Sequence, residues 1–393
     1  MATIRIQSSA GRYDVHCARG ALAQARSLIA RVGDSTGLYV LSSPRVWKFW
    51  GREITRRLRV GRDRVVLFDD RESRKRLATI EVIARKLTRA GADRHCTLVA
   101  VGGGVVGDVA GFAAATYLRG VRIVHVPTTL VAQVDSSIGG KTGVDLPEGK
   151  NLVGAFHPPK LVIVDPELLR TLPQREYRSG LYEVVKYGII ADAKLFAFLE
   201  DHVDALLRRD AAALDWIIPR CIAIKARVVN ADERESGLRK ILNYGHTLGH
   251  ALEAATQYKR FLHGEAVGLG MIAAAALAVQ SGHLNPRDCY RILRLIWRIG
   301  PVPDVPSIAP DKLLRLIAGD KKSRGGEVGW VLPDEIGRAE WDVRIPNALV
   351  RNKIELSSRV MEEFTKANGE PLIGFIQPST RRTTSIPGKH ASR

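Results

Sequence analysis

Buried strand patterns alternate with helical patterns over the first 165 residues or so, and this alternation constrains the fold more than any other feature. Short runs rich in valine, leucine and isoleucine have the length of buried strands and lie at residues 38–41, 65–68, 97–101, 123–126 and 161–164. Residues 74–90, between the second and third runs, have helical periodicity with a charged face. The alternation predicts an α/β domain with a parallel, nucleotide-binding type of sheet.

The second half of the chain has a different character. Residues 167–300 are helical by period, with breaks at glycine and proline, and a run at 328–333 is consistent with a late strand returning to the core. We therefore expect an α/β domain over residues 1–170 and an all-α domain over 171–355. Residues 368–393 are rich in Ser, Thr, Arg, Pro and Gly, which predicts a disordered tail.

Charge and composition indicate which kind of molecule the protein binds. The net charge is +19, but basic residues are interleaved with acids along the 393 residues, and no aromatic RNA-binding signature or zinc-finger spacing accompanies them. This pattern favours a small anionic partner over nucleic acid. The four cysteines form no C-x-x-C pair, the start has no secretory pattern, and the apolar run at 266–279 is short for a bilayer. We expect a cytoplasmic protein outside the membrane.

A glycine-rich turn follows the third predicted strand. Gly102, Gly104 and Gly107 match the dinucleotide-binding spacing G-x-G-x-x-G at the start of a helix. Backbone N–H groups at such a helix start can bind a pyrophosphate, with Asp108, Thr128 and Thr129 as side-chain donors or acceptors. The next strand ends in Pro-Thr-Thr without the usual carboxylate, so an orthodox Rossmann site is not expected. The plainer alternative is a tight strand–helix turn.

A second glycine segment carries cations. Gly139-Gly140-Lys141-Thr142 resembles the end of a P-loop, but Asp135 stands where that motif requires its first glycine, which excludes a nucleotide triphosphatase. We expect Lys141 on a flexible glycine loop, with Lys150 and Asn151 following as an anion clamp. Solvated loop charges are the alternative.

Histidines and carboxylates suggest a metal site. His246 and His250 have i,i+4 spacing on a predicted helix, with Glu253 on the same face. His263 precedes a glycine at the start of the alanine-rich helix, and Glu183 lies in another helical segment. One carboxylate and two imidazoles would leave zinc open positions for a substrate. The residues alone leave two ligand sets open, His246/His250/Glu253 and Glu183/His246/His263.

Cations and an amide lie near these residues in sequence. Arg239 and Asn243 would share a helix face, with His246 one turn further on, and Lys186 and Lys225 add two positive charges. This set would suit a carboxylate or phosphate beside a metal, and a solvated basic helix face is the alternative.

These segments together resemble the 3-dehydroquinate synthase family of sugar phosphate cyclases. The resemblance runs in order from about residue 60 to 335 and is carried by residues 102–108, 117–120, 126–130, 134–143, 149–156, 183–186, 242–247 and 263–265. It implies a two-domain enzyme, usually a homodimer, that uses NAD and one divalent metal, zinc or cobalt. The implied substrate is an anionic sugar-acid phosphate, 3-deoxy-D-arabino-heptulosonate 7-phosphate, which is converted to 3-dehydroquinate and phosphate.

The resemblance also assigns roles to individual residues. It implies that Glu183, His246 and His263 bind the metal. Implied catalytic residues are Lys141, Lys186, Lys225, Glu235, Arg239, Asn243 and His250. Implied substrate-binding residues are Asp135, Lys150, Asn151, Lys321, Lys322 and Arg119, the last donated across the dimer. Implied NAD-binding residues are Glu72, Lys75, Gly103, Gly104, Val105, Gly107, Asp108, Thr128, Thr129, Lys141 and Lys150.

Two departures concern the nucleotide end. Arg71 stands where the family usually has glycine before the ribose glutamate, and Ser42-Ser43 replaces a Thr-Asn or Thr-Asp pair. The competing functions are an inosose- or valiolone-type cyclase, a metal-dependent polyol dehydrogenase, and a basic nucleic-acid-binding protein without catalysis.

Overall fold

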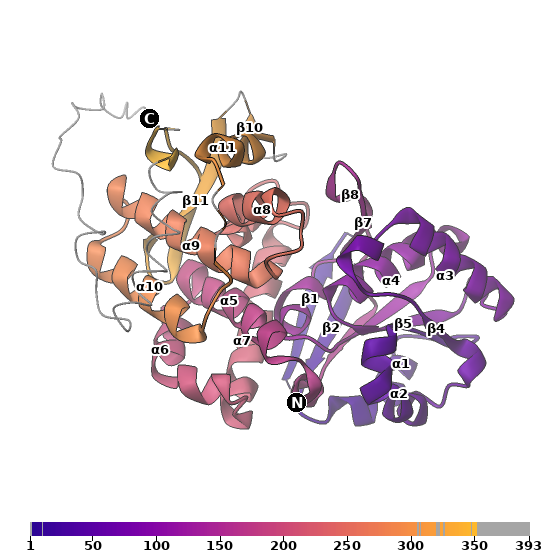
Figure 1. Ribbon diagram of the computed structural model, residues 1–393. Coiled ribbons are helices and arrows are strands. Elements are labelled where there is room, and N and C mark those ends of the chain that lie inside the picture. Colours follow the sequence, from indigo (N-terminus) through magenta and orange to yellow (C-terminus); the bar gives the residue numbers. More distant parts are fainter. Residues whose placement is uncertain are drawn as a thin grey trace, which may run out of the picture.

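The computed structural model describes residues 2–9, 11–304, 306, 308–319, 323–324, 327–346 and 348–351. The α/β half and the helical half of the chain lie side by side (Figure 1). The predicted tail at 368–393 and the two candidate lysines Lys321 and Lys322 lie outside the described residues.

A seven-stranded sheet forms the centre of the first half, in the order β1-β2-β9-β6-β5-β3-β4. All five predicted strands are confirmed, and they pair in parallel. They are β3 (Leu38–Ser42), β4 (Val65–Leu67), β5 (Thr97–Gly102), β6 (Arg122–Pro127) and β9 (Leu161–Val164). The α/β prediction is therefore correct.

An edge hairpin adds two strands that the sequence patterns did not single out. β1 (Ala2–Ser8) and β2 (Gly11–Cys17) pair antiparallel, and β2 then pairs in parallel with β9. Both strands are partly exposed, so they lack the continuous apolar runs of the inner strands. Tyr13, Val15 and Cys17 alternate toward one core, as the two-residue period of a strand requires.

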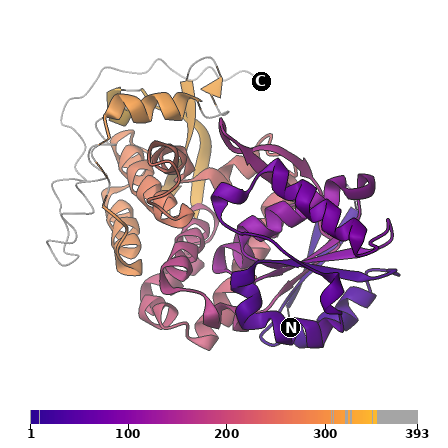
Figure 2. The ribbon, with the colours of Figure 1, turned by 45° about the vertical axis from the view of Figure 1, so that its right-hand side comes forward.

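Helices cover both faces of the sheet (Figure 2). α1 (Ala25–Ala30) and α2 (Pro44–Leu58) pack with Val99 and Val101 of β5, whereas α3 (Leu77–Arg89) and α4 (Gly104–Thr116) pack with Leu98 and Ala100. Both faces of β5 are thus buried, which explains its unbroken apolar sequence.

The second glycine segment leads into a hairpin. Gly139 and Gly140 lie in the turn before it, with φ of 97° and 67°, and Lys141 begins its first strand, so the loop position expected for Lys141 is wrong. β7 (Lys141–Leu146) and β8 (Gly149–Phe156) pair antiparallel, and Gly143 and Gly154 face each other across the pair. A Cβ on Gly154 would lie 2.1 Å from the carbonyl oxygen of Thr142. Gly143 and Gly154 thus permit the close approach of the two strands.

The second half begins after η6 (Pro166–Thr171) and is mainly helical. Its helices are α5 (Gln174–Ala191), α6 (Ala193–Leu207), α7 (Ala211–Ala231), α8 (His246–Ala255), α9 (His263–Gln280), α10 (Pro286–Ile299) and α11 (Pro310–Gly319). The expected late strand is β11 (Glu327–Glu335), which pairs with β10 (Ser323–Arg324) and β12 (Arg338–Arg344). The domain that was expected to be all-α therefore also contains a small three-stranded sheet.

Helix α9 is long and apolar enough to cross a membrane by length and composition alone. However, 83% of it is buried inside the fold, where it packs in the core of the helical half between α5, α8 and α10 (Figure 1). One apolar core joins this half to the first, since it includes Tyr13 of β2 and Val134 of η5 (Ala132–Ser136).

Candidate active site

Three helices bring a carboxylate and two imidazoles together. Glu183 lies inside α5, and His246 and His263 are the first residues of α8 and α9. Oε1 of Glu183 is 3.5 Å from Nε2 of His263 and 3.8 Å from Nε2 of His246. One ligand atom from each residue lies within 4.8 Å of the other two.

Glycines allow this close approach. A Cβ on Gly264 would lie 1.9 Å from the carbonyl oxygen of Ser179 on α5, and a Cβ on Gly270 would lie 1.8 Å from that of Gly245. Gly245 itself has a φ of 78°, which ends the preceding turn so that α8 can begin at His246. The backbone thus presents both histidines to the middle of α5.

The environment of Glu183 fits a divalent cation. Its side chain is fully buried, and neither carboxylate oxygen accepts a well-directed hydrogen bond from a described residue. Donor atoms held about 2.0–2.2 Å from a tetrahedral zinc ion lie roughly 3.3–3.6 Å apart, close to the spacing found here. Burial opposes ionisation, but the Lys186 ammonium, 2.5 Å from Oε2, lowers the pKa of Glu183 below its ordinary value.

The second nitrogen of His263 faces another buried carboxylate. Nδ1 lies 3.2 Å from Oε2 of Glu253 on α8. Burial disfavours the imidazolium, yet Glu253 and Glu183 outweigh that effect and raise the pKa of His263 to about 10. A metal ion at Nε2 would therefore compete with a proton.

The alternative set His246/His250/Glu253 is wrong as a grouping. The structure instead groups His250 with Glu253 and His263. The expected helix face shared by Arg239, Asn243 and His246 is also wrong. The first two lie in the 3-10 helix η7 (Leu238–Asn243), which the turn at Gly245 separates from α8.

A second cluster surrounds Asp135 in η5, beside the metal cluster. Its Oδ1 accepts hydrogen bonds from Lys225 Nζ at 2.5 Å and from the Tyr187 hydroxyl at 2.7 Å. Burial opposes the charge on Asp135, but Lys225 and Lys186 lower its pKa. Burial, with Arg239 nearby, lowers the pKa of Lys225 to about 8. Sequence reasoning missed Tyr187, although its i,i+4 spacing from Glu183 places it on the same face of α5.

The loop before α8 meets the start of β7. Glu235 forms an ion pair with Lys141 and accepts a hydrogen bond from Asn243 Nδ2 at 2.5 Å. Arg239, only 3% exposed, donates to the carbonyl oxygens of Glu233 and Gly139. The segment from Glu233 to Asn243 thus brings together four residues that were predicted to be catalytic, namely Lys141, Glu235, Arg239 and Asn243.

Four residues predicted to bind NAD, Glu72, Lys75, Asp108 and Lys150, lie near the turn that joins β7 to β8. Lys75 is buried and donates to Asp108 Oδ2 at 2.6 Å and to Asn151 Oδ1 at 2.5 Å. Lys150 lies 3.3 Å from Oε1 of Glu72. These residues form one charged network at the rim of the α/β half.

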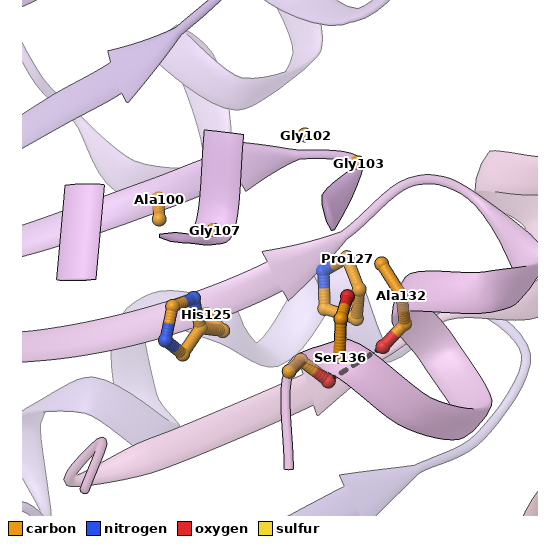
Figure 3. A pocket seen from close by; sticks show the side chains of 9 residues that line it. Ala100, Gly102, Gly103, Gly107, His125, Pro127, Ala132 and Ser136 are labelled. Atoms are coloured by element: carbon orange, nitrogen blue, oxygen red, sulfur yellow. Dashed lines mark hydrogen bonds between the residues drawn. The ribbon is translucent and has the colours of Figure 1, made fainter. Parts of the chain in front are cut away.

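The glycine turn connects β5 to α4 as expected, and α4 begins at Gly104. Thr128 N donates to the carbonyl oxygen of Gly102 at 2.9 Å, so the ends of β5 and β6 meet at the turn. A small pocket lies beneath the first turn of α4, where His125 projects (Figure 3). Residues 100, 102, 103, 107, 125, 127, 132, 136 and 137 line it. Sequence reasoning missed His125 and the two serines, because only the fold brings η5 under the turn.

Arg119 lies apart from this turn. It belongs to η4 (Tyr117–Arg119), which follows the C-terminus of the 13-residue helix α4. That helix is about 20 Å long. Arg119 is exposed and has a φ of 66°. Within a single chain the structure therefore places it far from the glycine turn.

Comparisons with known proteins identify the family of this chain. Residues 65–179 match the 3-dehydroquinate synthase N-terminal family model, and residues 180–323 match the 3-dehydroquinate synthase C-terminal model. The chain is 43% identical to a 3-dehydroquinate synthase from Pelotomaculum thermopropionicum over 90% of its own length and 95% of the relative's.

Solved structures show the same architecture. A 2-deoxy-scyllo-inosose synthase with carbaglucose-6-phosphate, NAD+ and Co2+ has a TM-score of 0.82 and 29% identity, covering 90% of this chain and 99% of that one. A 2-epi-5-epi-valiolone synthase from Streptomyces hygroscopicus with NAD+ and Zn2+ has a TM-score of 0.79 and 28% identity, covering 88% and 97%. With two family models that together span most of its length, the chain belongs to the 3-dehydroquinate synthase family.

Proposed function

We propose that the protein is a 3-dehydroquinate synthase that converts 3-deoxy-D-arabino-heptulosonate 7-phosphate to 3-dehydroquinate and inorganic phosphate. The observation that carries this proposal is the convergence of Glu183, His246 and His263 beside two buried lysines, Lys186 and Lys225. The 43% identity to a curated synthase over nearly the whole chain supports the same substrate.

Glu183, His246 and His263 would hold one divalent ion, zinc or cobalt, and the glycine turn with Asp108 and Thr129 would hold NAD. When bound, the metal acidifies substrate hydroxyls, and NAD+ accepts a hydride that it later returns. The solved relatives contain NAD+ with Co2+ or Zn2+, which supports both cofactors. His250, whose ring centroid lies 5.3 Å from that of His246, would contact the substrate beside the metal.

The cations of the site would orient the two anionic groups of the substrate. Lys141, Lys225 and Lys150 are each already paired with a carboxylate, so they are held in fixed positions before a ligand arrives. Fixed charges in a partly buried site stabilise developing negative charge without a large reorganisation. Elimination of phosphate and closure of the carbocycle would then depend mainly on this positioning.

We also propose that the enzyme is a cytoplasmic homodimer. A homodimer would bring Arg119 of one protomer to the active site of the other, which suits its exposed position away from the glycine turn of its own chain. We place the enzyme in the cytoplasm. Lys321 and Lys322 are proposed as substrate lysines on the family resemblance alone.

A coupled assay tests the proposal. The purified protein should release phosphate from the heptulosonate without accumulating NADH, and a chelator should stop the release. A polyol dehydrogenase would accumulate NADH instead. Sugar phosphates that lack the carboxylate, such as glucose 6-phosphate and sedoheptulose 7-phosphate, should release no phosphate, and turnover of either one in preference to the heptulosonate would reject the assignment.

A further inference from the structure

The imidazole of His263 lies between two carboxylates that are presented by different helices. Its Nε2 faces Oε1 of Glu183 at 3.5 Å, and its Nδ1 faces Oε2 of Glu253 at 3.2 Å. Glu253 is only 2% exposed, so this second contact is shielded from solvent. One ring nitrogen is therefore directed to the metal cluster and the other to a buried acceptor.

The two carboxylates differ in their remaining partners. Oε1 of Glu253 accepts a hydrogen bond from Lys150 Nζ at 2.9 Å, so both oxygens of Glu253 are engaged. Oε2 of Glu183 is paired with the Lys186 ammonium at 2.5 Å, whereas its Oε1 faces the imidazoles of His246 and His263 at 3.8 and 3.5 Å. This difference favours Glu183 as the metal ligand and leaves Glu253 outside the coordination sphere.

We infer that Glu253 is a positioning residue that fixes the orientation and tautomer of His263 for metal binding. The inference rests on the metal centre proposed above. A carboxylate that accepts the Nδ1 proton of a ligating histidine leaves Nε2 free to bind the metal and increases the basicity of the ring. Removing such a carboxylate weakens metal binding about 10- to 100-fold in well-studied sites.

Lys150 holds Glu253 from the opposite half of the molecule. It lies on β8, 2.9 Å from Glu253, 3.3 Å from Glu72, and 4.6 Å from the ring centroid of Tyr258. Gln257 and Tyr258 both have left-handed backbone angles, with φ of 54° and 57°, an arrangement that persists only where surrounding contacts enforce it. Lys150 thus acts on the metal centre through Glu253.

Metal affinity, measured by competition with a chromophoric chelator, tests this role without turnover. Glu253→Leu removes the acceptor and should weaken Zn2+ binding about 10- to 100-fold. Glu253→Gln keeps an acceptor oxygen and should lose less. The absorption bands of bound Co2+ should shift in both variants, because the ligand field depends on the orientation of His263. Asp165→Asn is the matched control, since Asp165 is also buried but bonds the backbone of Gly20, Leu22 and Glu167, and it should leave affinity and spectrum unchanged.

Several outcomes separate this inference from the metal-site proposal. If wild-type protein binds zinc, Glu183→Gln abolishes binding, and Glu253→Gln and Glu253→Leu stay within twofold with unshifted Co2+ bands, the positioning role is overturned and the metal site stands. If the Glu253→Leu variant does not fold, the Glu253→Gln variant decides alone. Zinc binding that survives Glu183→Gln and is lost in Glu253→Leu would place the metal on Glu253 and overturn both.

A double-mutant comparison tests the role of Lys150. Lys150→Met should weaken zinc binding in the wild-type background and have no further effect in Glu253→Leu. If the two substitutions instead lowered the binding free energy additively, Lys150 would not act through Glu253.

Discussion

Nε2 of His263 lies 3.5 Å from Oε1 of Glu183, a contact between the first residue of α9 and the middle of α5. No sequence period relates these residues, and only the packing of α9 against α5 brings them together. Because the carboxylate is fully buried, its natural partner in this geometry is a cation.

Replacing Glu183 with glutamine should abolish tight metal binding. The substitution keeps the volume of the side chain but removes the charge that the site supplies, so zinc affinity should fall by about a hundredfold or more. Metal content after dialysis, measured by elemental analysis, checks this. Glu176→Gln on the same helix is the control and should retain the metal. Equal metal content in the two variants would remove Glu183 from the ligand set.

Replacing Gly264 with alanine should separate α9 from α5. The added Cβ would lie 1.9 Å from the carbonyl oxygen of Ser179, so the helices must move apart. We expect a loss of about 1–3 kcal/mol in the free energy of unfolding, together with weaker zinc binding. Urea denaturation and metal titration measure the two effects. Gly319→Ala, at a position with open space, should change stability by less than about 0.5 kcal/mol.

Replacing His125 should change the acid sensitivity of the fold. Burial lowers the pKa of His125 from 6.5 to about 4, so the unfolded chain takes up a proton at this position before the folded protein does. This group therefore makes the protein less stable as pH falls from 6.5 toward 4, by about 2.5 kcal/mol at pH 4.5. Urea titrations at pH 7.5 and 4.5 should show a smaller acid loss in His125→Gln than in wild type. An equal loss in both proteins would mean that His125 is not buried as a neutral ring.

Lys225 should control the alkaline limb of activity. Its pKa is lowered to about 8, so its ammonium, paired with Asp135, loses a proton as pH rises through that value. Activity should fall over the same range, and Lys225→Arg, which keeps its charge, should move the limb to higher pH. Lys225→Met should lose about 10²-fold in kcat at pH 7. An unchanged limb in Lys225→Arg would assign it to another group.

The sequence predicted the inner strands well, because β5, β6 and β9 are buried on both faces and so read as continuous apolar runs. The edge hairpin β1–β2 escaped notice because partly exposed strands lack that signal. Lys141 was expected on a glycine loop but begins β7, since the turn at Gly139 and Gly140 gives no sign in sequence of the strand that follows it.

The candidate metal site, too, was only partly predictable from local sequence spacing. From the residues, His246, His250 and Glu253 formed a plausible set because i,i+4 spacing is visible in sequence. All three residues do lie on α8, where the rings of His246 and His250 are 5.3 Å apart, but the carboxylate of Glu253 faces the far nitrogen of His263. The family resemblance selected Glu183, His246 and His263, a set that depends on contacts between three helices and cannot be derived from any local period.

Anomalous X-ray diffraction at the zinc absorption edge, on crystals grown with zinc, would locate the bound metal. We expect one strong peak within about 2.0–2.2 Å of a carboxylate oxygen of Glu183 and of Nε2 of His246 and His263. A peak held by His250 and Glu253 instead, or no peak among these side chains in crystals that contain zinc elsewhere, would contradict it.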